Sequence, residues 1–264
     1  MRVEVLTSGI WQTTTTILAA PDGTCVIADP AYFPRELDAI AARVAELGRA
    51  EAVLFTHGHW DHVMGHAIFP GAPVVTSATL AALVAAGDPR ATRYLDDARD
   101  FDSRWYVPRP HGHRWPATLR GAADGERLEL GGIALTALYL PGHSPDGLGV
   151  RVDALDLLLV GDYLSPCEIP FVDDLDAYRA TLRRLLALLP DLREVIPGHG
   201  PRLAAADAAA IARADLDYLD GLAEASTAEA VARVPLPRAA DVAGMLDHHR
   251  DNCAKAVNRA IEAP

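Results

Sequence analysis

The chain carries His57-Gly58-His59-Trp60-Asp61-His62 directly after the apolar run Ala52-Val53-Leu54-Phe55. The apolar run predicts a buried strand, and the glycine lets the loop that follows turn tightly. Because successive residues of an extended segment point to opposite sides, His57 and His59 share a side and can bind one ion together. The aspartate and the last histidine open the next segment and face another direction. Four metal-ligand side chains in six residues therefore predict two metal ions side by side.

Three more candidate ligands follow apolar strands further along the chain. They are His143 in Pro141-Gly142-His143, Asp162 in Val160-Gly161-Asp162 and His199 in Pro197-Gly198-His199. In each case a glycine precedes the ligand and allows the backbone to bend sharply near the site. Imidazole and carboxylate side chains at strand ends are a common way to build a rigid metal site. A single histidine is more often structural, but seven candidates of the correct type favour a metal centre.

Length, charge and composition narrow the class of protein. The 264 residues, half of them apolar, suit one large α/β domain. The formal net charge of -12 disfavours nucleic acid as a partner, because phosphate binding normally needs a basic patch, and indicates a small-molecule substrate instead. The sequence contains no run of about 18 apolar residues, which a membrane-spanning helix would need. The N-terminal residues begin directly in strand-like alternation, so we expect no signal peptide and a cytoplasmic protein.

The three cysteines are odd in number and far apart, at positions 25, 167 and 253. This spacing predicts three reduced thiols in a cytoplasmic protein. The alternative for Cys167, which lies near the Gly161-Asp162 motif, is a thiol that lines the site.

Strand and helix signals alternate along most of the chain. Strands are expected at residues 3–7, 14–19, 24–29, 52–55, 73–76, 127–130, 133–140, 147–152, 155–160 and 194–196, and helices at 34–47, 77–86, 175–189, 203–224 and 239–261. Residues 88–126 lack a clear period and predict an inserted loop or lid with one short helix. We divide the chain into a domain over 1–225 and a helical extension over 226–264, packed on that domain. The order of strands and helices in each half predicts helix layers outside two facing sheets.

The ordered set His-x-His-x-Asp-His, Gly-His, Gly-Asp and Gly-His resembles the metallo-β-lactamase superfamily over residues 3–225. The resemblance implies an α/β (α+β) fold, the αββα sandwich of two mixed sheets flanked by helices, with a dinuclear site at one edge. It implies a first ion held by His57, His59 and His143, a second held by Asp61, His62 and His199, and Asp162 bridging both. It also implies that Asp29 orients a ligand histidine.

The resemblance implies two divalent metal ions, with zinc expected and iron or manganese as alternatives, because histidine and carboxylate ligands accept all three. A bound divalent metal lowers the pKa of water to about 7, so a metal-bound hydroxide is the expected nucleophile. The second ion would help to stabilise the oxyanion that forms. No Gly-x-Ser-x-Gly nucleophile elbow is present. We therefore expect hydrolysis without a covalent enzyme intermediate.

Named positions separate the branches of the family. Oxygen-reducing diiron relatives typically have glutamate where this chain has His59, so His59 disfavours that branch. Exported β-lactamases often lack the aspartate that stands here as Asp162, which argues against a β-lactamase. Processing ribonucleases need a basic surface, which the net charge of -12 does not favour. The glyoxalase-II-like and lactonase-like group remains, which acts on thioesters, lactones or esters. The C-terminal residues lack a convincing cluster of basic side chains of the kind that would bind glutathione. The alternatives are a mononuclear-iron sulfur or persulfide dioxygenase and a non-catalytic binding protein.

The catalytic candidates are Asp61 and Tyr163. Tyr163 directly follows the expected bridging ligand, so it could hydrogen-bond the substrate carbonyl or protonate the leaving group; a packing role is the alternative. Trp11 lies in an early loop and could line the pocket or lie on the surface.

We expect the remaining histidines to have structural or surface roles. His66 follows the motif at helical spacing, and His111 and His113 lie in the expected lid as solvated side chains. On the last helix, Asn252 lies three residues after His249, next to His248. This group could close over the pocket or support a metal ligand; the alternatives are an ordinary helix face and a homodimer contact.

Overall fold

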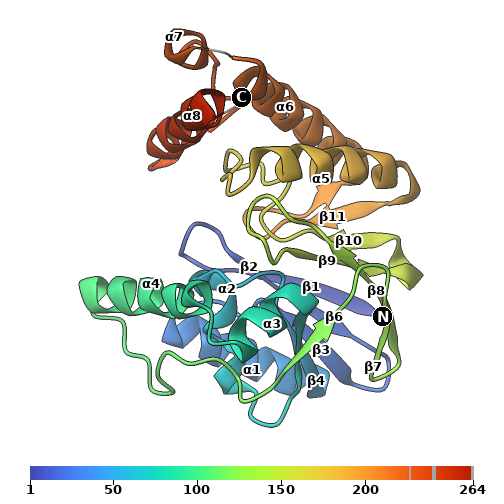
Figure 1. Ribbon diagram of the computed structural model, residues 1–264. Coiled ribbons are helices and arrows are strands. Elements are labelled where there is room, and N and C mark those ends of the chain that lie inside the picture. Colours follow the sequence, from blue (N-terminus) through green and yellow to red (C-terminus); the bar gives the residue numbers. More distant parts are fainter. Residues whose placement is uncertain (226, 240–241, 263–264) are drawn as a thin grey trace.

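The computed structural model describes residues 1–225, 227–239 and 242–262. Two six-stranded sheets face one another, with helices on their outer faces (Figure 1). The first sheet holds β1 (Arg2–Thr7), β2 (Thr14–Ala19), β3 (Thr24–Ala28), β4 (Arg49–Leu54), β5 (Val74–Ser77) and β6 (Leu119–Ala122) in that order. The second has the order β12 (Leu203–Ala204), β11 (Glu194–Ile196), β10 (Leu157–Leu159), β9 (Leu148–Val152), β8 (Ile133–Tyr139) and β7 (Arg127–Leu130).

Both sheets are mixed. In the first, β1, β2 and β3 are antiparallel neighbours, whereas β3, β4, β5 and β6 run parallel. In the second, β7 to β10 form an antiparallel meander, β11 is parallel to β10, and β12 is antiparallel to β11. The predicted sandwich of two mixed sheets is confirmed.

Eight α-helices and three 3-10 turns accompany the sheets in the described part of the chain. They are α1 (Pro34–Leu47), α2 (Trp60–Val63), α3 (Ala78–Ala85), α4 (Pro89–Trp105), α5 (Leu175–Leu188), α6 (Ala205–Glu224), α7 (Ala228–Val231) and α8 (Met245–Glu262), with 3-10 turns η1 (His66–Ile68), η2 (Asp153–Leu155) and η3 (Leu189–Asp191). In Figure 1, α1 and α3 lie outside the first sheet and α5 and α6 outside the second. Among the described residues, no helix has the length and apolar character needed to cross a membrane.

The core lies in three layers. The central layer packs Leu18, Val26 and Leu54 of the first sheet with Leu135 and Val150 of the second. Separate apolar clusters lie beneath α1 and α3 and beneath α5 and α6. All six residues of β2 and all five of β3 are buried, because these strands are covered on both faces.

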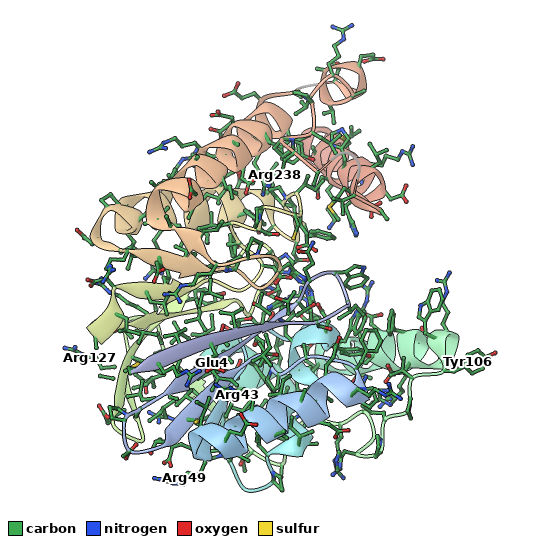
Figure 2. The ribbon with its side chains drawn as sticks, turned by 180° about the vertical axis from the view of Figure 1, so that it is seen from behind. Glu4, Arg43, Arg49, Tyr106, Arg127 and Arg238 are labelled. Carbon is green, nitrogen blue, oxygen red and sulfur yellow. The ribbon has the colours of Figure 1, made fainter. Side chains whose placement is uncertain are left out.

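Helix α1 matches its predicted bounds at both ends. Proline stands at its first position, where the missing N–H has no intrahelical partner to lose. Leu37, Ile40 and Val44 form its buried face. On its other side Arg43 donates to both carboxylate oxygens of Glu4 on β1, each over 2.6 Å (Figure 2).

The loop or lid expected over residues 88–126 is wrong in its main part. Residues 89–105 form the 17-residue helix α4, and residues 119–122 form β6, which pairs in parallel with β5. Tyr94, Leu95 and Ala98 are buried, while the many charges on the exposed face hide this period in the sequence. Tyr106 caps the C-terminal end of the helix; it is 93% exposed and points away from the molecule (Figure 2).

The C-terminal residues include helix α8, which packs against α6 and α7. Helix α8 begins at Met245, later than the predicted Ala239; residues 240 and 241 lie outside the described residues. It contacts α6 and α7 and lies on the same side of the sandwich as α4 (Figure 1). The two helices thus flank the edge where the candidate ligands lie.

Candidate metal centre

The seven predicted ligands come together at one edge of the sandwich, where the strands end. His57 and His59 follow β4, and Asp61 and His62 lie in the short helix α2 that comes next. His143 follows β8, Asp162 follows β10, and His199 follows β11. All seven are at least half-buried, and His62 is fully buried. Residues up to 142 positions apart in the chain therefore meet in one small volume.

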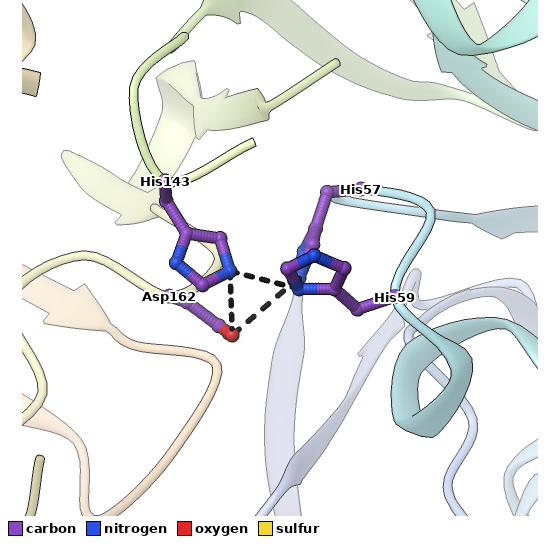
Figure 3. Close-up of side chains that lie close together, drawn as sticks. All are labelled: His57, His59, His143 and Asp162. Atoms are coloured by element: carbon purple, nitrogen blue, oxygen red, sulfur yellow. Dashed lines mark hydrogen bonds and ion pairs between the residues drawn. The ribbon is translucent and has the colours of Figure 1, made fainter. Parts of the chain in front are cut away.

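The first group of ligand atoms belongs to His57, His59, His143 and Asp162 (Figure 3). Nδ1 of His59 lies 3.0 Å from Nε2 of His57 and 3.0 Å from Nε2 of His143. Oδ2 of Asp162 lies 3.1 Å from Nε2 of His143 and 3.4 Å from Nε2 of His57. Four potential ligand atoms thus surround one point.

The second group belongs to Asp61, His62 and His199. Nε2 of His62 lies 3.3 Å from Nε2 of His199 and 3.4 Å from Oδ2 of Asp61. Asp162 also reaches this group, because its Oδ1 lies 3.2 Å from Nε2 of His62 and its Oδ2 3.3 Å from Nε2 of His199. One carboxylate therefore faces both groups.

These separations fit bound metal ions. Tetrahedral ligands at ~2.0–2.1 Å from a metal lie about 3.3–3.4 Å from each other, and the distances above range from 3.0 to 3.4 Å. Oδ1 of Asp162 is buried without a hydrogen-bond partner among the described residues. It makes an ionic contact with Nε2 of His62 at 3.2 Å, and because buried polar atoms normally make hydrogen bonds, a buried oxygen without one at this position points to a cation.

The outer nitrogens of three ligand histidines each face a fixed acceptor. Nδ1 of His62 lies 3.1 Å from Oδ2 of Asp29, Nδ1 of His143 lies 3.1 Å from the carbonyl oxygen of Phe171, and Nδ1 of His199 lies 3.0 Å from that of Trp11. Each acceptor favours a proton on Nδ1 and leaves the Nε2 lone pair for a metal. The role expected for Asp29 is confirmed, and the same carboxylate also accepts from the backbone N–H and the hydroxyl of Thr56.

Burial and charge set the protonation of the centre. Burial lowers the pKa of His57 and of His59, so both rings are neutral. Burial acts in the same direction on His62, but the carboxylates of Asp61 and Asp162 outweigh it and raise its pKa well above the usual value. Burial raises the pKa of Asp162, yet the histidines around it lower that pKa well below its usual value. The two carboxylates thus require nearby positive charge, which a divalent cation would supply in place of protons.

The model of the metallo-beta-lactamase superfamily matches residues 9–199, a range that contains all seven ligands. The chain belongs to the metallo-beta-lactamase superfamily. Among its curated relatives, a probable metallo-hydrolase of Bacillus subtilis, YqgX, is 27% identical over 208 residues, which cover 68% of this chain and 82% of the relative. The hydroxyacylglutathione hydrolase GloC of Haemophilus influenzae is 24% identical over 208 residues, covering 76% and 91%. The crystal structure of TTHA1623 in a di-iron-bound form has 27% identity and a TM-score of 0.57, covering 77% of this chain and 96% of that one.

Two cavities meet at this superfamily centre. The first, of about 320 Å³, is lined by ligand residues and by Trp11, Trp60, Phe171 and Met245. The second, of about 310 Å³, lies between α4 and α8. Five residues line both: His59, Asp97, His143, Phe171 and His248. Trp11 lines the first cavity and also lies at the surface, since it is 54% exposed; its ring packs edge-on against Trp60 at 5.3 Å.

Tyr163 does not reach either cavity, in contrast to the catalytic role expected for it. Its hydroxyl donates to the carbonyl oxygen of Pro141 over 2.7 Å and accepts from the backbone N–H of His143 over 3.0 Å. The side chain is only 2% exposed and packs against Tyr178. Tyr163 therefore holds the loop that carries His143, and of the two catalytic candidates only Asp61 lines the cavity.

Two supporting residues were missed in the sequence. Asp146 is fully buried, and its carboxylate accepts from the backbone N–H of Gly58 over 2.8 Å and from the hydroxyl of Tyr94 over 3.2 Å, which fixes the metal loop. Glu168 is also buried and lines the first cavity, and burial raises the pKa of its carboxyl to about 7. Neither belongs to a motif, but Asp146 lies only three residues after His143, and this proximity was the available signal.

The remaining histidines have structural or cavity-lining roles. Nδ1 of His66 lies 2.9 Å from the carbonyl oxygen of Val63 in the preceding turn. Nε2 of His113 lies 2.7 Å from the buried carboxylate of Asp102, whereas His111 is exposed, so the two do not form a metal pair. His248 packs against Phe171 with tilted rings whose centroids are 3.7 Å apart, and Nδ1 of His249 lies 2.9 Å from the hydroxyl of Tyr218. The cysteines are free, and Cys167 lines neither cavity.

Asn252 connects α8 to the metal centre. Its amide donates to the carbonyl oxygen of Pro170 over 2.6 Å and accepts from the backbone N–H of Val172 over 3.3 Å. These contacts flank Phe171, whose carbonyl oxygen accepts from His143. Lys255, also on α8, donates to the carbonyl oxygen of Val172. Helix α8 thus supports a metal ligand, one of the roles considered for it.

Replacing Asn252 by alanine is expected to weaken metal binding about 10- to 100-fold, because the segment that carries the Phe171 carbonyl, the acceptor for His143, loses its anchor. The buried backbone groups left unpaired should lower the free energy of unfolding by about 1–3 kcal/mol. Competition with a chelator measures the first effect and urea denaturation the second. Arg250→Ala, at an exposed position of the same helix, serves as the control. Metal affinity equal to that of the wild type would show that α8 does not support His143.

Proposed function

We propose that this chain is a dinuclear metal-dependent hydrolase that cleaves the carbonyl group of a small thioester, lactone or ester. The observation that carries the proposal is the pair of ligand groups that share Asp162 and open into a cavity with apolar walls. Such a cavity suits an acyl group, and the ligand atoms lie where a carbonyl would meet them.

Two divalent cations, when bound, lower the pKa of water and polarise the carbonyl oxygen. The residues of this chain hold that arrangement in place. The Thr13 hydroxyl lies 3.1 Å from Oδ2 of Asp61 and donates to it, Asp29 holds His62, and Asp146 holds the metal loop. Trp11 and Trp60 form one wall of the cavity and pack against each other. Tightly held ligands keep the site organised before substrate binds.

The relatives support the substrate class. GloC is named for hydrolysis of hydroxyacylglutathione, which is a thioester, and we place a thioester first among the three substrate classes. We propose zinc as the metal, because four nitrogen and oxygen atoms at tetrahedral separations suit it. The di-iron form of TTHA1623 makes iron the second candidate.

Purified protein, stripped of metal and then restored with zinc, iron or manganese, should be assayed on a panel of thioesters, lactones, esters and phosphodiesters. We expect restored protein to hydrolyse at least one carbonyl substrate, and His59→Ala to remove most of that activity. Equal turnover by the stripped protein and by His59→Ala would contradict the proposal. A single bound iron together with oxygen consumption would instead identify the alternative, a sulfur or persulfide dioxygenase.

A further inference from the structure

The loop of residues 8–13, between β1 and β2, contacts the second ligand group directly. The carbonyl oxygen of Trp11 lies 3.0 Å from Nδ1 of His199. The hydroxyl of Thr13 lies 3.1 Å from Oδ2 of Asp61. The position of this loop therefore affects two of the three side chains in the second group.

This loop has an unfavourable backbone conformation at two consecutive residues. Trp11 and Gln12 have φ angles of 46° and 59°, in the left-handed region that side chains other than glycine rarely adopt. In this conformation the carbonyl oxygen of Trp11 faces His199, and that of Gln12 accepts from the backbone N–H of Gly200 over 3.0 Å. Such a conformation persists only where surrounding contacts impose it. Because Trp11 is more than half exposed, burial of its ring alone does not impose the turn, and the loop needs a further anchor.

Glu36, in the first turn of α1, supplies this anchor. Its Oε2 accepts from the hydroxyl of Ser8 over 2.6 Å, and its Oε1 accepts from the backbone N–H of Gly9 over 2.8 Å. The Ser8 hydroxyl in turn accepts from the backbone N–H of Ile10 over 3.1 Å. Burial raises the pKa of Glu36, but hydrogen bonds from Gly9, Ser8 and the backbone of Phe33 outweigh it and lower that pKa. The acceptor is therefore a carboxylate, and hydrogen bonds to an ionised group are the stronger kind.

We propose that Glu36 is a positioning residue for the second metal site: it holds the loop of residues 8–13, and through this loop the orientation of His199 and Asp61. Among the described residues, no hydrogen bond or ion pair joins the loop to His57 or His59 of the first group. Glu36 should therefore affect the metal affinity of the second group and leave that of the first unchanged. The inference rests on the proposed two-ion centre and adds a residue that controls one of its two sites.

The test measures cobalt(II) binding, by absorption titration, in two backgrounds that each leave one ligand group complete. His59→Ala leaves the second group complete, and His199→Ala leaves the first. Loss of an outer contact that orients a ligand weakens metal binding by roughly 10- to 100-fold, and Glu36 acts one step further out, so we expect about tenfold. Glu36→Gln should cause this loss in the His59→Ala background and none in the His199→Ala background. Ser8→Ala, which removes the hydroxyl that Glu36 holds, should act in the same direction.

Glutamine is the informative replacement because it can keep the start of α1 capped. Its amide oxygen can accept from the Ser8 hydroxyl and from the backbone N–H of Phe33, which both donate to Oε2 of Glu36. Its amide nitrogen cannot accept from the N–H of Gly9. Glu46→Gln, at an exposed position of the same helix, is the matched control and should change neither affinity.

Melting temperatures of all variants should be recorded beside the titrations. Equal weakening in both backgrounds would overturn the inference, because it indicates a general loss of structure; unchanged affinity in both would overturn it too. Failure of folded His59→Ala protein to bind cobalt would also overturn it, since the second group would then hold no ion by itself. Metal binding is measured without a substrate, so a failure to hydrolyse any compound of the panel would overturn only the proposed function.

Discussion

Replacement of Asp162 by asparagine is expected to release at least one metal ion and to reduce turnover by about a thousandfold or more. The carboxylate lies within 3.1–3.4 Å of ligand nitrogens of both groups, and asparagine removes the charge that both cations require. Metal polarisation contributes several kcal/mol to such reactions, and each ~1.4 kcal/mol is a factor of ten in rate. Metal content after gel filtration and the rate on the best substrate of the panel measure the two effects.

The control for this variant is Asp38→Asn, at an exposed position on α1. It removes the same charge from the chain without touching the centre, so its metal content and rate should match those of the wild type. Full metal occupancy in Asp162→Asn with an unchanged rate would show that this carboxylate does not connect the two ligand groups.

Replacement of Arg238 by alanine is expected to lower the free energy of unfolding by about 3–5 kcal/mol, because one partner of a buried ion pair is removed. Arg238 donates through both terminal nitrogens to Asp215 of α6, which is 1% exposed, and through Nε to the carbonyl oxygen of Ser165 over 2.9 Å. It lies beside α6 (Figure 2), and its contact with Ser165 reaches the loop that leads to Glu168. Urea denaturation at pH 8 measures the loss.

The loss should be smaller at pH 5 than at pH 8. Burial raises the pKa of Asp215 to about 6 even with Arg238 present, and removing the guanidinium raises it further. A carboxyl whose pKa is higher in the folded state favours folding below its unfolded pKa and loses this contribution as the pH rises through the folded value. The double variant Arg238→Met/Asp215→Leu should recover part of the stability, since no buried charge remains. A loss independent of pH would mean that Asp215 is not the group left unpaired.

The local signals in this sequence were sufficient to predict the candidate ligands and the arrangement of two sheets with outer helices. Each ligand follows an apolar strand directly or within a few residues, so the strand ends bring these side chains to one edge of the sandwich. The pattern of His57, His59, Asp61 and His62 is complete within six residues, and the later ligands repeat the same strand-glycine-ligand arrangement. The hydrophobic periodicity of residues 34–47 likewise predicted both ends of α1.

Contacts between distant segments could not be predicted in this way. Tyr163 follows a ligand directly, yet its hydroxyl turns to Pro141 because the buried backbone there needs a donor. Asn252 reaches Pro170, 82 residues earlier, and only the packing of α8 brings them together. Helix α4 lies where a loop or lid with one short helix was predicted, because the many charges on its exposed face obscure the period of its buried positions.

The sequence by itself determined which residues form the candidate metal centre, and with them the superfamily, because the capacity to bind metal depends on side-chain chemistry and on short-range backbone geometry. The tertiary structure alone decided what surrounds that centre: the cavity between α4 and α8, the buried carboxyl of Glu168 in its wall, and the helix that supports His143. These features depend on which faces of separate elements meet. That outcome is set by the packing of the whole core, for which no short stretch of residues carries a signal.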